Sequence, residues 1–376
     1  MKFETVKISD LISEISMGPF GSNIKVECFV DDGIPVLNGS NLDGVALKED
    51  TFRYVTEEKA NSLGKANAHK DDVVITHRGT LGQIVFIPQD SLYDRYVISQ
   101  SQFRVKCNDR ILPEYLVYYF HTRIGQHKLL SNASQVGVPA LARASTTFQT
   151  IEIDLPDLES QQKIVSLLET IRYKISLNQQ INKNLEEQAQ AIYKEFCTHD
   201  ENWLNGTVGD VVILQRGYDL PKNKMVKGPY PVAGSTGTIF FHNQYMVESP
   251  CIVLGRSGNI GKPRLYLEPC WPHNTSLFSR EFKNSNSLWV YFLLHHLDYS
   301  AFQGGSAVPT LNRNHIHSYQ IKIPPINEQE SFARTIEPMI KTLFHHRKES
   351  EKLSSMRDAL LPRLMSGEID VSGIEL

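Results

Sequence analysis

Two long stretches of the chain place apolar residues at alternating steps of four and three. The first runs from about Glu159 to Phe196, and its repeating positions are Ile164, Leu168, Ile171, Ile175, Asn178, Asn182, Leu185, Ala189 and Ile192. The second begins near Asn327, and its positions are Phe332, Ile336, Met339, Leu343, His346, Ser350, Leu353, Arg357 and Leu360. A period of 3.5 residues predicts two long helices, each with a seam along one side.

Polar residues interrupt both seams at the same two steps, Asn178 and His346 at the first, Asn182 and Ser350 at the second. Polar seam positions lower stability but fix register and partner choice. A helix of about 38 residues is about 57 Å long, more than an ordinary domain needs. We therefore expect the two helices to pair lengthwise as an antiparallel coiled coil. The alternative is that each amphipathic helix packs on its own globular unit.

The ends of the second helix carry their own signals. Asn327-Glu328-Gln329-Glu330 resembles a capping box, in which Asn327 accepts from the backbone of Glu330 and Glu330 reaches back. Pro338 lies inside the pattern and predicts a kink or a restart of the helix there. Pro362 marks the end of the helix or its last turn.

The segments outside the helices repeat one order of short signals. Each helix is preceded by an alternating run closed by proline, Ile151–Pro156 and Tyr319–Pro324, which predicts a strand. Earlier in each half come a loop, a glycine turn after a β-type run, an aromatic helix and a Val-Pro-x-Leu-x-Arg motif. The matched copies are Pro35–Ser40 with Pro231–Thr236, Val73–Gly82 with Cys251–Gly261, Tyr115–Phe120 with Trp289–Leu294, and Val138–Arg143 with Val308–Arg313.

This order predicts a tandem duplication with mixed α/β fold. Within the glycine turns, Gly79 matches Gly258 and Gly82 matches Gly261. The chain then reads as a globular unit, a long helix, a second similar unit and a second long helix, with an internal pseudo-twofold relation. Because a solenoid needs at least three repeats, two large units suggest two binding modules.

Composition narrows the picture only slightly. The chain has 376 residues, 41% hydrophobic and 22% charged, with a formal net charge of -3. This is ordinary for a globular protein, and a local basic patch would still permit DNA binding. The five cysteines are scattered without a C-x-x-C pair, so we expect reduced thiols and no metal site. No signal peptide or membrane-length apolar run is apparent, which favours a cytoplasmic location.

Several of these motifs together resemble a known family. They are Gly18-Pro19-Phe20-Gly21-Ser22, the paired Val-Pro-x-Leu-x-Arg segments, LPDLESQQKI at Leu155–Ile164, IPPINEQESF at Ile323–Phe332, and LLPRLMSGEIDV at Leu360–Val371. Over nearly its whole length the chain resembles the specificity (S) subunit of a type I restriction-modification enzyme. The second unit departs from the first of these motifs, since it offers Gln215-Arg216-Gly217-Tyr218-Asp219.

The resemblance implies a division of labour along the chain. Residues 1–156 and 201–324 would be target recognition domains, each reading one half of a split sequence in double-stranded DNA. Residues 157–200 and 325–376 would be the spacer helices, the latter with a C-terminal tail. These helices would set the spacing and dock two methyltransferase (modification) subunits, which bind S-adenosylmethionine. Motor-nuclease (restriction) subunits can join, and the S subunit itself carries neither a cofactor nor catalysis.

The sequence offers no catalytic motif of its own. The Pro324-Pro325 pair follows Ile323, unlike the Asn/Asp-Pro-Pro-aromatic loop of an adenine methyltransferase. Gly255–Lys262 is one residue too long for a phosphate loop, and Pro263 stands where Ser or Thr should bind Mg²⁺. His345-His346 could suggest a metal, but His346 fits the helix seam. The rival functions are an enzyme with its own site and a scaffold whose duplicated units bind only proteins.

Reading DNA requires donors and acceptors at base edges and cations at phosphates. In the first unit the candidates are Ser22, Asn23, Lys25, Asn38, Ser40, Asn41, His77, Arg78, Thr80, Ser134, Gln135 and Arg143. In the second they are Arg216, Tyr218, Ser235, Thr236, Arg256, Ser257, Asn259, Lys262, Ser306, Thr310, Asn312 and Arg313. Each also has an ordinary reading, because Asn, Ser and Gly serve turns in any protein.

Arg143 and Arg313 stand out among these candidates, because both copies of the motif keep a cation there. Within the same motif, Pro139 and Pro309 are expected to shape the loop. Leu141 and Leu311 are expected to anchor it in the core.

Overall fold

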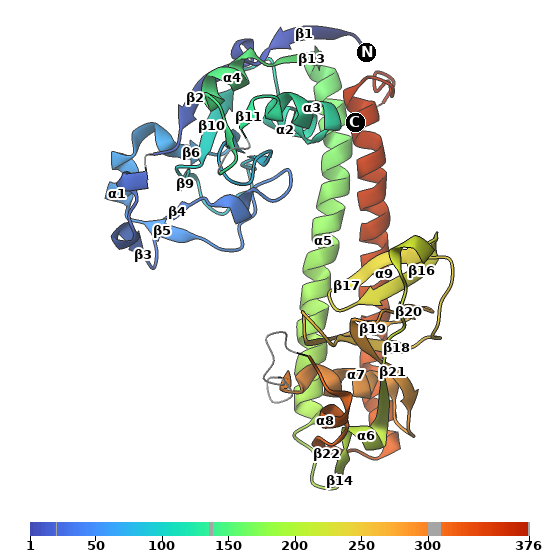
Figure 1. Ribbon diagram of the computed structural model, residues 1–376. Helices are drawn as coiled ribbons and strands as arrows, with labels where there is room; N and C mark the ends of the chain where they lie inside the picture. Colours follow the sequence, from blue (N-terminus) through green and yellow to red (C-terminus); the bar gives the residue numbers. More distant parts are fainter. Residues whose placement is uncertain (20, 135–137, 300–309, 375–376) are drawn as a thin grey trace. The chain divides into compact units, whose positions relative to one another are not determined.

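The computed structural model describes residues 1–19, 21–134, 138–299 and 310–374 (Figure 1). It divides into two compact units, Met1–Ile175 together with Glu351–Leu376, and Ser176–Ser350. Each unit therefore combines a globular part with segments of two long helices. The candidate residues Gln135 and Ser306 lie outside the described residues.

The globular part of the first unit contains two main sheets. A four-stranded antiparallel sheet has the order β2 (Ile12–Met17), β10 (Gln102–Cys107), β7 (Asp72–Thr76) and β8 (Ile84–Phe86). A five-stranded sheet has the order β3 (Phe29–Val30), β5 (Arg53–Val55), β4 (Ile34–Val36), β9 (Arg95–Val97) and β6 (Asn67–His69). Two short pairs complete it, β1 (Phe3–Lys7) with β13 (Glu152–Pro156) and β11 (Ala133–Ser134) with β12 (Ala140–Leu141).

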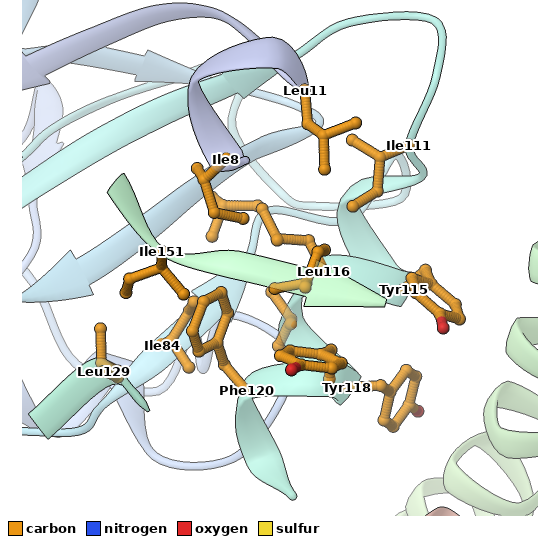
Figure 2. Close-up of a cluster of buried hydrophobic side chains, with 14 of the residues drawn as sticks. Ile8, Leu11, Ile84, Ile111, Tyr115, Leu116, Tyr118, Phe120, Leu129 and Ile151 are labelled. Carbon is orange, nitrogen blue, oxygen red and sulfur yellow. The ribbon is translucent and has the colours of Figure 1, made fainter. Parts of the chain in front are cut away.

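Short helices join and cover these sheets. The α-helices are α1 (Glu57–Ser62), α2 (Pro113–His121), α3 (Arg123–Leu130) and α4 (Ala144–Thr150). The 3-10 turns are η1 (Ile8–Asp10), η2 (Gly21–Asn23), η3 (Val26–Cys28), η4 (Gly39–Leu42) and η5 (Gly64–Ala66). All six residues of α2 from Tyr115 to Phe120 are buried, so this aromatic helix is the centre of the core (Figure 2). The Tyr118 hydroxyl donates to Glu169 Oε1 at 2.6 Å, which ties the core to the long helix.

The globular part of the second unit uses the same plan. Its four-stranded sheet has the order β15 (Val212–Arg216), β21 (Ser276–Phe282), β18 (Cys251–Gly255) and β19 (Gly261–Tyr266). The other sheets are β17 (Gly237–His242), β16 (Lys227–Gly234) and β20 (Trp271–Pro272), and the pair β14 (Leu204–Thr207) with β22 (Gln320–Ile323). The short helices are α6 (Val208–Val211), η6 (Lys222–Lys224), α7 (Ser287–His296) and α8 (Arg313–His317).

The strand orders confirm the duplication that the sequence predicts. In each four-stranded sheet the strand that comes first in the sequence, β2 or β15, pairs with the one that comes last, β10 or β21. The two strands joined by the glycine turn follow, β7 and β8 or β18 and β19. The second sheet of each unit holds one parallel pair, β4 with β9 and β16 with β20. The units differ mainly in this second sheet, which has five strands in the first and three in the second.

The two long helices are α5 (Leu158–Phe196) and α9 (Ile326–Met365). In the first unit, Ile164 and Leu168 of α5 share one core with Leu361 and Leu364 of α9. In the second unit, the rings of Phe196 and Phe332 stack with centroids 5.0 Å apart, and residues earlier in α5 meet residues later in α9. The helices therefore pack together in antiparallel order, as expected.

The alternative arrangement is also partly present. In the first unit the paired helices share the core of the globular part around α2, and in the second the core around α7. Every seam residue of the two heptad patterns is buried or partly buried. Buried residues outside the seams, such as Tyr193 and Ile340, face the globular core. Thus a second stripe on each helix packs on the globular parts.

Two expectations about α9 need correction. The helix begins at Ile326, so Asn327 lies inside it and is not its N-cap. The helix also continues through Pro338 without a restart. Proline removes one backbone hydrogen bond, but Ile336 and Ile340 on either side are buried in the core and hold the turn in place.

Candidate nucleic-acid interface

A short turn between β9 and β10 organises the loops of the first unit. The backbone N–H of Gly18 donates to the carbonyl of Gln102 at 2.8 Å, which holds the loop after β2. The N–H groups of His77 and Arg78 both donate to the carbonyl of Ser101, at 2.9 and 3.3 Å, which holds the glycine turn after β7. The turn at residues 99–102 therefore lies between two loops that are far apart in the sequence.

The Val-Pro-x-Leu-x-Arg segment closes this group of loops. Leu141 N–H donates to the carbonyl of His77 at 2.8 Å, and Gly79 N–H donates to that of Pro139 at 2.9 Å. Gln83 Nε2 donates to the carbonyl of Gly39 at 2.9 Å and adds the loop after β4. We call residues 18–19, 21–25, 38–42, 77–83, 99–102 and 138–143 the first loop cluster.

The second unit builds the same arrangement with other residues. Gly217 N–H donates to the carbonyl of Ser276 at 3.0 Å, and Arg256 N–H to that of Thr275 at 3.0 Å. Leu311 N–H donates to the carbonyl of Arg256 at 2.9 Å, in the manner of Leu141 in the first unit. We call residues 216–219, 235–236, 255–262, 272–276 and 310–313 the second loop cluster.

Glycine is required at equivalent places in both clusters. A Cβ on Gly18 would lie 1.9 Å from the carbonyl oxygen of Ser99, and one on Gly217 would lie 2.2 Å from that of His273. Gly217 therefore takes the place of Gly18, although the residues around it differ. The matched glycines of the turns adopt positive φ, +92° and +78° for Gly79 and Gly258, as few other residues do.

Most candidate residues of the first unit lie at the surface of the first loop cluster. The exposed ones are Asn23, Lys25, Asn38, Ser40, Arg78, Thr80 and Arg143, and Ser134 is exposed on β11. Ser22 lies in η2. Lys25 Nζ is 3.6 Å from Glu27 Oε1, so its charge is partly offset.

Two candidates of the first unit serve the loops themselves. Asn41 is buried; its Nδ2 donates to the carbonyls of Lys48 and Thr51 at 2.9 and 3.0 Å. His77 is partly buried, with Nε2 3.1 Å from the carbonyl oxygen of Gln100. Burial lowers the pKa of His77, so the neutral ring is favoured. Because Asn41 is fully buried, its side chain is not accessible to a partner.

The second loop cluster presents its candidates in the same way. Arg216, Thr236, Lys262, Thr310, Asn312 and Arg313 are exposed, whereas Tyr218, Ser235, Arg256, Ser257 and Asn259 are partly buried. The ring of Tyr218 packs against Phe278 with centroids 5.6 Å apart. Asn259 Nδ2 donates to the carbonyl of Ser235 at 3.4 Å, which joins two of the loops.

The equivalent arginines differ in detail. Arg143 precedes α4 with a left-handed backbone, φ 47°, while Arg313 is the first residue of α8. Both side chains are exposed. The motif therefore places a cation at the surface of each cluster, although the local backbone conformation differs between the two copies.

The central turns were missed by sequence reasoning. Gln100 and Ser101 in the first unit, and His273, Asn274 and Thr275 in the second, lie where the loops converge. The sequence feature that could have indicated these turns is a short polar segment between two β-type runs, which occurs at the same place in both repeats. Arg264 was missed as well, because it stands inside a strand and outside any turn signal.

The clusters offer hydrogen-bonding groups and cations without a catalytic constellation. Among the described residues, no group of three or more His, Cys, Asp or Glu could hold a metal ion. Within that same part of the chain, no helix is long and apolar enough to cross a membrane. Such surfaces suit recognition of a polar, anionic partner.

The family described as type I restriction modification DNA specificity domain matches residues 2–187 and 200–354. The chain belongs to this family. It is a specificity subunit, a component of type I restriction-modification systems that is not itself catalytic. This membership sets aside both rival functions, the independent enzyme and the protein-only scaffold.

Known relatives of this specificity subunit agree. The chain is 22% identical over 364 residues to the type I restriction enzyme MjaIX specificity subunit of Methanocaldococcus jannaschii. The matched region covers 85% of this chain and 82% of the relative. The chain is 30% identical over 118 residues to the HindI specificity subunit of Haemophilus influenzae, 31% of this chain and 25% of that one. The fold matches the crystal structure of the S subunit from M. genitalium, with a TM-score of 0.66, 15% identity and coverage of 97% and 96%.

Proposed function

We propose that the two loop clusters each read one half of a bipartite target in double-stranded DNA. The observation that carries this is the shared frame of the two clusters: backbone hydrogen bonds from Gly18, His77 and Leu141 recur at Gly217, Arg256 and Leu311 and support different exposed side chains. A shared frame with different side chains suits two readers that recognise different base pairs. The recognition domains are residues 1–156 and 201–324, linked by residues 157–200 and followed by residues 325–376.

The long helices set the spacing of the two half-sites. This proposal is supported by the antiparallel packing of α5 and α9 and by the continuity of each helix across the unit boundary. A helix of 39 residues spans about 58 Å and resists bending when paired. The helices also dock two methyltransferase subunits, which supply S-adenosylmethionine and flip the target adenine. Restriction subunits join the same assembly.

Methylome sequencing tests the reading of DNA. A host that carries the methyltransferase partner should show a split methylated motif with this chain and lose it without the chain. Exchange of the loop cluster of one domain for that of a relative should change one half of the motif and leave the other half intact. A motif that changes in both halves would contradict independent reading by the two domains.

Removal of one heptad from each helix tests the spacing. Seven residues correspond to about 10 Å of helix, close to three base-pair rises of DNA. The deletion should therefore shorten the unmethylated spacer by about three base pairs, and a matched insertion should lengthen it by a similar amount. An unchanged spacer in a folded, active variant would refute the ruler role without affecting the reading of the half-sites.

A further inference from the structure

The two recognition domains differ in their charge. Residues 1–156 contain 16 Lys and Arg against 19 Asp and Glu, whereas residues 201–324 contain 11 Lys and Arg against 7 Asp and Glu. The first domain therefore carries an acidic excess and the second a basic excess. Because each phosphate of DNA is an anion, this difference predicts unequal attraction of the two domains to the same duplex.

Ion pairs leave the net charge of each domain unchanged, but they involve a larger share of the cations in the first domain. In the first domain seven basic side chains lie within ion-pair distance of a carboxylate, namely Lys25, Lys48, Lys65, Lys70, Arg95, Arg104 and Arg110. In the described part of the second domain, ion pairs form at Arg216 and Lys322. Nine cations in each domain thus have no ion pair among the described residues, but those of the second domain are accompanied by 7 Asp and Glu instead of 19.

Two of these cations lie side by side on β19. Lys262 and Arg264 are exposed, and they alternate with the buried Gly261 and Pro263. The backbone of Lys262 is left-handed, with φ 52°, so the exposure of both side chains, and not regular strand alternation, places them at the surface. Among the described residues neither has a carboxylate partner within ion-pair distance. The counterpart strand of the first domain, β8, is buried at all three positions and offers no cation.

Arg264 also borders the second loop cluster. A Cβ on Gly237 would lie 1.9 Å from Arg264 Nη1, and the backbone of Gly237 has φ +122°. The guanidinium of Arg264 therefore lies against Gly237, beside the turn that carries Ser235 and Thr236. The side chain of Arg264 is thus next to the proposed DNA-reading loops.

The segments that follow β2 in the first domain and β15 in the second also differ in charge. In the second domain it begins at Gly217 and presents Lys222 and Lys224, both exposed on η6. The equivalent connection in the first domain begins at Gly18 and contains Glu27, Asp31 and Asp32, with Lys25 paired to Glu27. The two connections leave equivalent backbone positions but carry opposite charge.

We propose that the second recognition domain supplies most of the phosphate contacts, through Lys262 and Arg264 on β19 and Lys222 and Lys224 on η6. This inference rests on the proposed function and adds an inequality between its two halves. We assign all four residues to phosphates and not to base edges, Lys262 of the second loop cluster included. Phosphate contacts hold the complex on any sequence, so these residues govern affinity and its salt dependence and leave the recognised motif unchanged.

The test uses the full chain assembled with its methyltransferase subunits. Affinity is measured over a range of salt concentrations for a duplex with the methylated motif and for a scrambled duplex. The variants are K262Q with R264Q, and K222Q with K224Q. The matched control is K7Q with K106Q, two exposed lysines of the first domain for which no ion pair is found among the described residues. All three variants remove two positive charges from the same chain.

A plot of log affinity against log salt has a negative slope, and each lost phosphate contact should make this slope less steep by about 0.9. For both second-domain variants the slope should therefore become less steep by about two on both duplexes. The control should keep the wild-type slope, and all variants should methylate the same motif. Wild-type slopes in the second-domain variants, an equal loss in the control, or a changed motif would each overturn the proposal. If the wild-type complex itself showed no preference for the motif, the proposed function would fail instead.

Discussion

Gln161 and Gln329 occupy equivalent positions near the start of the two long helices. Gln161 Nε2 donates to the carbonyl oxygen of Pro156 at 3.0 Å, and Gln329 Nε2 donates to that of Pro324 at 2.8 Å. Both glutamines are buried, with exposed fractions of 0% and 1%. Each side chain therefore joins its helix to the proline that closes the preceding strand.

The other end of each amide reaches the aromatic helix. Gln161 Oε1 accepts from the backbone N–H of Leu112 at 3.0 Å, the residue before α2. Gln329 Oε1 accepts from that of Asn286 at 2.9 Å, the residue before α7. One side chain thus holds a strand, a long helix and a core helix together, which accounts physically for glutamine in both strand–proline–helix motifs.

Replacement of either glutamine by alanine should destabilise its own unit. Gln161→Ala or Gln329→Ala leaves buried backbone groups without partners, at about 1–3 kcal/mol for each such group. Urea unfolding of the full chain should show a loss of about 2 kcal/mol or more. The controls are Gln162→Ala and Glu330→Ala, whose side chains are exposed next to the buried ones. Equal effects of control and test variants would contradict the role of the buried amide.

The polar seam positions allow a second prediction. Asn178 has no exposed surface; its Nδ2 donates to Glu349 Oε2 at 2.8 Å and to Ser350 Oγ at 3.3 Å. Its Oδ1 is buried without a hydrogen-bond partner among the described residues. Asn178→Leu should therefore raise the free energy of unfolding by about 1 kcal/mol, since polar seam residues cost stability.

The same substitution should weaken control of helix register, because the asymmetric amide no longer selects its partners. The spacer of the methylated motif should become less uniform in methylome sequencing, whereas Gln179→Leu on the exposed face should leave it unchanged. A more stable variant with a uniform spacer would show that other contacts fix the register.

The sequence was sufficient for the features that depend on periodicity and order. The heptads predicted both long helices to within a few residues, because one apolar seam must repeat along the whole helix. The ordered repeat of loop, turn, aromatic helix and proline-closed strand predicted two similar units. The pairing of polar seam residues follows from antiparallel order: His346 Nδ1 lies 3.1 Å from Asn182 Oδ1, and Ser350 meets Asn178.

Features that depend on tertiary contacts were less accessible. Proline propensity argued for a kink or a restart at Pro338, but the helix continues there, and burial on both sides of it outweighs one lost hydrogen bond. Asn41 looked like a binding residue because asparagine is common in functional loops, yet it is buried as a turn support. The central turns at Gln100 and Asn274 became visible only when the backbone showed which loops converge on them.

The arginines of the repeated motif provide a test of direct DNA contact. Arg143→Ala and Arg313→Ala should each weaken DNA binding with little change in stability, since both side chains are exposed. Arg143 has φ 47°, so Arg143→Gly should relieve about 1 kcal/mol of backbone strain compared with Arg143→Ala. If the cation is what matters, glycine and alanine should lower affinity equally although their stabilities differ. Recovery of affinity by Arg143→Gly would point to loop shape instead.

The pH dependence of stability should depend in part on His317. The backbone N–H of Leu214 donates to His317 Nε2 at 2.8 Å, which requires a neutral ring with its proton on Nδ1. Burial, assisted by the nearby charges of Arg313 and Lys283, lowers the pKa of His317 from 6.5. The folded state therefore takes up this proton at lower pH than the unfolded state does.

The sign of the effect follows from this difference in proton uptake. The contribution of His317 is fully present above about pH 6.5 and is lost as the pH falls toward the lower folded-state pKa. His317→Gln keeps an acceptor for Leu214 but cannot titrate, so its unfolding free energy should change less between pH 7.5 and pH 5.5. Some dependence should remain, because burial also lowers the pKa of His121 and His295.

A second substitution separates the acceptor from the titration. His317→Leu removes both, so compared with His317→Gln it should lower stability at every pH by about 1–3 kcal/mol, because the Leu214 N–H then lacks its partner. It should also share the flatter pH profile of His317→Gln. If His317→Gln instead lost stability on acidification as steeply as the wild type, the proton taken up would belong to other groups, and the hydrogen bond from Leu214 would have to survive protonation of the ring.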